Sequence, residues 1–159
     1  MPDACATLSV ELSEGALPEC VLAGPRLTSG ERTPGGGHAF LGVRLLPGVA
    51  FLLTGIAVHT LTERRTPLAM VLPDETPRFE QYLTRADTIE DRFDALEEFL
   101  EQRLIGRYID ARVYSAITRI EASAGLIRMA QLASECRVSP RHLNRLVHNW
   151  VALVRSSSQ

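Results

Sequence analysis

Hydrophobic and polar residues alternate in three short stretches of the first 47 residues, at 6–12, 19–23 and 39–46. Alternation with a period of two is typical of strands that bury one face. Glycine, proline and serine separate the stretches, as expected of turns. The segment 24–38 holds two prolines and five glycines and is predicted to be a long loop. The first part of the chain is therefore expected to be rich in β-structure.

After Pro77 the hydrophobic spacing changes to about 3.6 residues, the period of a helix. Thr88 and Asp91 match a capping box, with Asp in place of the usual Glu, and so predict the start of a helix. An apolar stripe is expected along one face of this helix, at Ile89, Phe93, Leu96, Leu100 and Leu104. The opposite face carries six carboxylates, a pattern more typical of a solvated surface than of a metal or acid–base site. Gly106 is predicted to end the helix.

Three shorter helices are predicted in the rest of the chain. The first begins near Asp110, has apolar residues at helical spacing from Val113 to Ile120, and ends before Gly125. The other two cover 127–134 and 139–150 and are separated by a tight turn.

The second of these two helices has a well-marked start and two distinct faces. Ser139 is predicted to cap it, and Pro140 occupies the first helical position, where a missing N–H is harmless. Its inward face is expected to carry Leu143, Leu146, Val147 and Trp150. Its outward face carries Arg141, His142, Asn144, Arg145 and His148. In the helix before it, the small Ala133 suits a close crossing of two helices.

Together these elements predict an α+β fold in three parts. Residues 1–78 are expected to form a small β-rich N-terminal domain for sensing or dimerisation, and residues 79–106 an acidic amphipathic linker helix. Residues 107–159 are expected to form a C-terminal three-helix unit containing one helix-turn-helix. The spacing is equally compatible with a helical hairpin in an unrelated α domain, and only the polar outward face favours the helix-turn-helix.

Composition and charge place the chain among ordinary globular proteins. It is 45% hydrophobic and 23% charged, and neither a membrane span nor a signal peptide is apparent, so a cytoplasmic location is expected. Three cysteines without a C-x-x-C pair indicate reduced thiols. The net charge of −2 is unevenly divided: residues 107–159 have eight arginines against three carboxylates, a balance of +5. Polyanion binding is therefore expected in the C-terminal part.

The outward residues suit DNA recognition. Arginine pairs bidentately with guanine and asparagine with adenine in the major groove. Ser139 and the helix N-terminus can hold a phosphate.

Two segments of the sequence resemble those of a known protein family. Residues 127–151, IRMAQLASECRVSPRHLNRLVHNWV, resemble the first helix-turn-helix of AraC/XylS-type transcription regulators, with their inward Leu-Ala pair, Gly-x-Ser turn and Pro-Arg-x-Leu-x-Arg motif. Residues 42–48, GVRLLPG, are similar to a strand in the β-rich N-terminal domain of one group of these regulators. The resemblance implies a DNA-binding set composed of Ser139, Pro140, Arg141, Asn144, Arg145 and His148. Of these, Arg141, Asn144 and Arg145 would contact bases, with Ser139 and His148 nearer the phosphates.

The chain departs from the family pattern in its turn and at its ends. Arg137 stands where the family has glycine, so we expect either a positive φ at Arg137, at a cost of about 1 kcal/mol, or a turn of slightly different geometry. Family members carry two helix-turn-helix units, whereas this chain stops where the connecting helix should begin, and it starts inside a strand. We therefore expect a chain truncated at both ends, with DNA affinity nearer ~10⁻⁴–10⁻⁶ M, the non-specific range.

The resemblance implies a transcription regulator that binds double-stranded DNA as a homodimer, with a possible small-molecule effector and without a cofactor, a metal or a membrane. The alternative is a ligand-sensing or dimerising module with weak or vestigial DNA binding. An enzyme is disfavoured, because the sequence has no nucleophile–base motif, no H-E-x-x-H and no P-loop.

Overall fold

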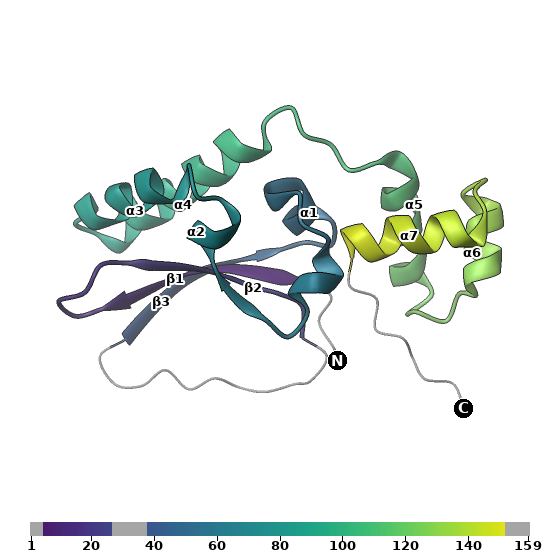
Figure 1. The fold of residues 1–159 in the computed structure, drawn as a ribbon, viewed down its shortest axis with the longest axis horizontal. Helices are drawn as coiled ribbons and strands as arrows, with labels where there is room; N and C mark the ends of the chain where they lie inside the picture. Colours follow the sequence, from purple (N-terminus) through teal and green to yellow (C-terminus); the bar gives the residue numbers. More distant parts are fainter. Residues whose placement is uncertain (1–4, 27–37, 152–159) are drawn as a thin grey trace.

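A computed structural model describes residues 5–26 and 38–151 of the chain (Figure 1). The described residues form seven α-helices, one 3₁₀ helix and a four-stranded antiparallel sheet. The predicted α+β class is thus confirmed. Most of the loop predicted over 24–38, namely residues 27–37, lies outside the described residues.

The sheet has the strand order β3-β1-β2-β4. Its central strands β1 (Ala6–Ser13) and β2 (Glu19–Ala23), and β3 (His38–Leu45) at one edge, match the three predicted strands within one residue at each end. The short β4 (Arg65–Pro67) was not predicted and pairs with the end of β2.

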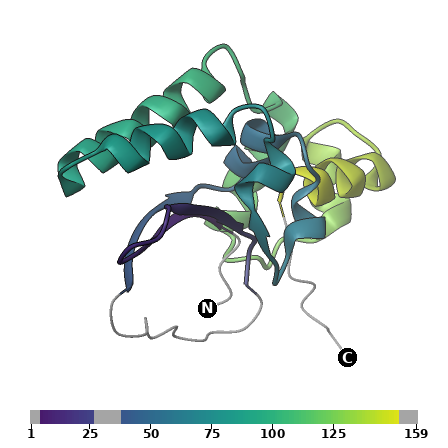
Figure 2. The same ribbon diagram turned by 60° about the vertical axis from the view of Figure 1, so that its left-hand side comes forward.

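Alternation along the strands places one face of the sheet in the core. Leu8 of β1 pairs with Leu22 of β2 on one side and with Val43 of β3 on the other. Two helices cover this face, α3 (Thr76–Arg85) and α4 (Ile89–Leu104), and Figure 2 shows them side by side over the curved sheet. Phe79 and Leu83 of α3 are buried in the same cluster as Leu8 and Leu22. The segment 79–106 therefore contributes to the sheet's core, in addition to leading toward the C-terminal helices.

The predicted start and end of α4 are confirmed. The backbone N–H of Asp91 donates to Thr88 Oγ1 at 3.1 Å, and the Thr88 N–H donates to Asp91 Oδ2, also at 3.1 Å. The hydrogen bonds from Thr88 hold the pKa of Asp91 below its ordinary value. Gly106, just past the end of α4, has a φ of 70°.

The predicted apolar stripe of α4 is only partly buried. Ile89 and Phe93 on its first two turns are 43% and 50% exposed. The buried face of α4 is instead the one that contacts α3, where the rings of Phe79 and Phe99 stack with centroids 4.3 Å apart. Leu96 is buried there.

Three short helical segments lie between β3 and α3 along the chain: α1 (Val49–Thr54), the 3₁₀ helix η1 (Val58–Leu61) and, after β4, α2 (Leu68–Val71). Arg103 in the last turn of α4 and Arg107, three residues after that helix, hold α1 in place. Arg103 Nε donates to the carbonyl of Leu53 at 2.9 Å, and Arg107 Nη1 donates to that of Leu52 at 2.8 Å. These bonds satisfy carbonyls of the last turn of α1, which has no intrahelical partner for them.

The buried thiol of Cys20 should be chemically inert. Burial raises its pKa to about 12, with the carboxylates of Glu80 and Glu19 adding to the effect. The reactive thiolate would then be about one part in ten thousand at pH 8. With iodoacetamide at pH 8 and mapping by mass spectrometry, we expect the partly exposed Cys136 to be modified and Cys20 to stay unmodified until the protein unfolds. Equal rates at both thiols in the folded protein would contradict this placement.

The last three helices share a second hydrophobic core. They are α5 (Ala111–Ala122), α6 (Met129–Glu135) and α7 (Pro140–Trp150). Figure 1 shows them together beyond the sheet. The buried members of this core are Val113, Ala116, Ile117, Leu132, Ala133, Leu143, Val147 and Val151. No helix within the described ranges is long and apolar enough to cross a membrane.

Candidate nucleic-acid interface

The turn between α6 and α7 is fixed by two backbone hydrogen bonds. The N–H of Val138 donates to Ala133 O at 3.0 Å, and that of Arg137 donates to Ser134 O at 3.1 Å. This pair of bonds is the Schellman arrangement, which requires a left-handed residue after the helix. Arg137 is that residue, with a φ of 55°. Of the two alternatives expected at Arg137, the positive φ is confirmed.

The start of α7 is built as predicted. Ser139 is the N-cap, and its Oγ accepts the backbone N–H of His142 at 3.2 Å. Pro140 is the first helical residue. The turn and the cap together fix the direction in which α7 leaves α6.

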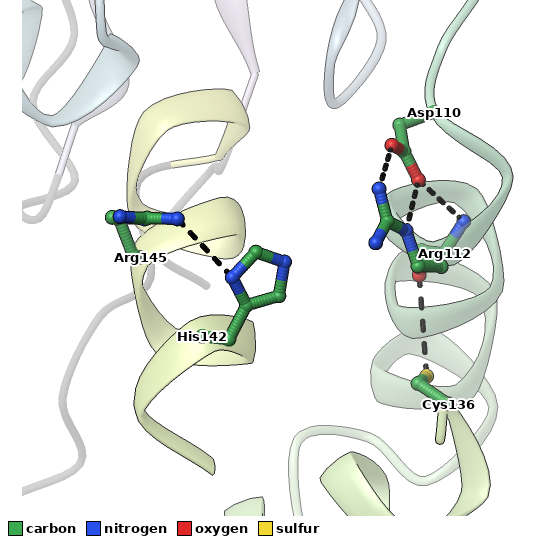
Figure 3. Close-up of polar contacts among 5 residues, drawn as sticks. All are labelled: Asp110, Arg112, Cys136, His142 and Arg145. Atoms are coloured by element: carbon green, nitrogen blue, oxygen red, sulfur yellow. Dashed lines mark hydrogen bonds and ion pairs between the residues drawn. The ribbon is translucent and has the colours of Figure 1, made fainter. Parts of the chain in front are cut away.

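Polar side chains gather at the N-terminal end of α7 around a shallow hollow of about 270 Å³, lined by Ser139, Arg141, His142 and Arg145. Arg145 Nη2 donates to His142 Nδ1 at 3.2 Å (Figure 3). Because a guanidinium can only donate, this contact requires His142 Nδ1 to be unprotonated. His142 thus belongs to the cluster, although it was absent from the predicted DNA-binding set. Its spacing of three residues from both Ser139 and Arg145 is the signal in the sequence that could have found it.

The arginines of the helical unit formed by α5, α6 and α7 fall into two groups, those paired with a carboxylate and those that are not. Arg112 forms an ion pair with Asp110, with Nη2 and Oδ2 2.7 Å apart (Figure 3), and Arg119 forms one with Glu135. Among the described residues, Arg141 and Arg145 make no ion pair with a carboxylate, and the same is true of Arg128 and Arg137. Their positive charge is therefore available to an anion from outside.

Pairing with Arg112 lowers the pKa of Asp110. Its Oδ1 accepts the N–H of Arg112 at 2.8 Å and so caps α5. The side-chain hydrogen bond from Arg112 is the main reason why the pKa of Asp110 falls to about 2. This carboxylate stays ionised across the physiological range and is committed to the helix start.

The structure places two members of the predicted set away from this hollow. Asn144 is half-buried and does not line it. His148 shares a face of α7 with Arg141, but two turns further along, where that face meets η1. There the rings of His148 and His59 stack with centroids 5.4 Å apart. His148 Nδ1 is buried without a hydrogen-bond partner. His148 is thus only partly exposed, because η1 covers part of this face, and the sequence shows a helix face but not which part of it a neighbouring element covers.

The described part of the chain contains no group of three or more histidine, cysteine, aspartate or glutamate residues placed to hold a metal ion.

Comparisons of the whole chain with protein-family models, with curated proteins and with solved structures find no match.

Proposed function

We propose that the chain is a sequence-specific DNA-binding protein, a transcription regulator of the AraC type that reads the major groove with α7. The observation that carries the proposal is the pair of arginines without carboxylate partners, Arg141 and Arg145, at the capped N-terminal end of a helix that follows a tight turn. Two short helices joined by a turn of three to four residues form the helix-turn-helix, whose second helix enters the groove with its N-terminal residues.

In this mode of binding, phosphates and bases are recognised by different groups. A phosphate would lie at the N-terminus of α7, where the backbone N–H groups and the Ser139 hydroxyl can donate to it. Arg141 and Arg145 would donate to guanine O6 and N7, and Asn144 would pair with adenine after a change of side-chain rotamer. Arg145 would exchange its hydrogen bond to His142 for one to a base, so its side chain is already held near the groove. The regulator would act as a homodimer, since each α7 covers one half-site.

The proposal is tested by replacing Arg145 and measuring whether the chain loses its preference for one DNA sequence over another. Duplexes enriched from a random pool by the whole chain at low salt would be compared with scrambled duplexes by fluorescence anisotropy. We expect Arg145→Ala to weaken binding to the enriched duplex by ~1–3 kcal/mol and to the scrambled one by much less. Arg85→Ala, which removes the same charge from an exposed position on α3, is the matched control and should leave the difference between the two duplexes intact.

An equal loss on both duplexes would remove the base-reading role of Arg145 and leave it a phosphate contact. Failure of the wild-type chain to prefer any enriched duplex would overturn the proposed function itself.

A second candidate function, sensing of a small molecule, is favoured by a hollow of about 300 Å³ between α3 and α4. This volume is at the lower end of the range for ligand sites. Its lining combines the aromatic rings of Phe79, Tyr82 and Phe99 with charged groups that include Arg78 and Glu98. A polar aromatic molecule suits such a lining. The absence of selective DNA binding by the wild-type chain would favour this function over DNA recognition.

A further inference from the structure

The C-terminal end of α7 is attached to the part of the molecule formed by the sheet and the helices up to α4, the sheet-bearing part. In Figure 1 this end lies against α1 and η1, while the end that bears Ser139 points away from the sheet. The rings of Phe51 on α1 and Trp150 on α7 have centroids 4.5 Å apart. Close by, His59 Nδ1 and the backbone oxygen of His148 are 2.9 Å apart. The two ends of α7 therefore have different surroundings, one exposed and one held.

The hydrogen bond from His59 is donated to the backbone carbonyl of His148, which has no donor within its own helix. His148 is in the last turn of α7, whose carbonyls have no partner within the helix. Because a carbonyl oxygen can only accept, His59 must carry its proton on Nδ1. His59 thus caps α7 from outside, in the way that a positively polarised group at a helix C-terminus does.

The elements that supply this contact are themselves fixed. The carbonyls of Leu52 and Leu53 at the end of α1 accept from Arg107 and Arg103, the last two arginines before α5. Arg103 Nη1 also pairs with Glu75 Oε1 at 2.9 Å. Through these bonds α1 is held against α4, which packs on the sheet. Through its contacts with α1 and η1, the C-terminal end of α7 is thus joined to the part of the molecule that contains the sheet.

We propose that His59 and Phe51 are positioning residues for DNA recognition: they hold the C-terminal end of α7 and so set the angle at which its N-terminal end meets the groove. This inference rests on the proposed function. Contacts to base edges need side chains placed within about 0.5 Å and 10–20°. A helix fixed at one end by the sheet-bearing part meets that requirement better than one held by the small helical core alone.

Trp150 allows the contact to be observed without DNA, because it is the only tryptophan in the chain. In the whole protein, we expect His59→Ala and Phe51→Ala each to shift Trp150 emission to longer wavelength, while far-UV circular dichroism stays unchanged. Loss of one hydrogen bond should also lower the ratio of affinities for enriched and scrambled DNA by about three- to tenfold in His59→Ala.

Two further variants separate positioning from local packing. His59→Asn keeps an N–H donor near the position of Nδ1 and should restore both the emission and the affinity ratio. Thr60→Ala is the matched control, since Thr60 is equally exposed on η1 but its hydroxyl donates to Ala57 O, within its own turn, at 2.6 Å. It should change neither readout.

Each outcome has a definite meaning. Wild-type selectivity that survives His59→Ala, or an emission that does not move, overturns the positioning role and leaves the proposed function standing. Absence of selectivity in the wild-type chain overturns both the proposed function and the role of His59 in DNA recognition, whereas the emission shift still reports whether His59 holds α7.

Discussion

Leu143→Ala is expected to lower the free energy of unfolding of the helical unit by about 2–5 kcal/mol. Leu143 is fully buried in the second core, between α7 and the helices α5 and α6. Removing its side chain takes apolar atoms out of a site that three short helices can only partly close, so both lost burial and a cavity contribute. Urea denaturation followed by Trp150 fluorescence measures the change directly, because Trp150 is on the same helix.

Leu146→Ala is the matched control for this prediction. The sequence pattern places Leu146 on the inward face of the helix, but the structure leaves it only partly buried, at the edge of the core. We therefore expect its loss to be clearly smaller than that of Leu143. Equal losses for the two variants would mean that α7 is rotated relative to its core.

The strands show how far a simple hydrophobic pattern predicts a fold. Residues 6–13 alternate between hydrophobic and polar because one face of the sheet lies in the core and the other does not. This pattern can be seen in the sequence alone. The run from 47 to 58 has no such period. It contains α1 and the first residue of η1, two short elements whose residues leave no readable spacing.

Helix ends were predicted more exactly than helix faces. The caps at Thr88, Asp110 and Ser139 are local, since each depends on a side chain and a backbone N–H two or three residues away. The burial of Phe93 and His148 depends instead on which distant element covers that part of the helix. Phe93 remains exposed, and His148 is partly covered by His59. Neither outcome is encoded within the helix that carries the residue.

The same distinction separates the two halves of the candidate site. The cluster at the N-terminal end of α7 follows from Ser139, Pro140 and the spacing of the basic residues, so the sequence predicts it. The attachment at the other end joins His59 to His148, 89 positions apart. A single sequence gives no reason to pair these two histidines, and only the packing of η1 on α7 brings them together.

Gly24→Ala is expected to destabilise the sheet-bearing part strongly, by roughly 3 kcal/mol or more, at the upper end of overpacking effects. A Cβ at position 24 would lie 1.8 Å from the carbonyl oxygen of Leu61, which is backbone and cannot rotate away. The approach is fixed from both sides, because Gly24 N–H donates to Arg64 O at 2.9 Å and Glu63 N–H donates to Pro25 O at 3.0 Å. The glycine is needed for this close contact and not for an unusual φ.

Gly42→Ala is the appropriate control, since its added Cβ would come no closer than 3.4 Å to another atom and should cost little. Urea denaturation of both variants followed by circular dichroism measures the difference, and equal stabilities would contradict the close approach of β2 to η1. The Gly24 variant has a second expected effect at lower denaturant. Leu61 and His59 belong to the same short helix, so the shift that relieves the clash should also disturb the cap on α7. The emission of Trp150 should then move to longer wavelength in Gly24→Ala before unfolding begins, and remain unchanged in Gly42→Ala.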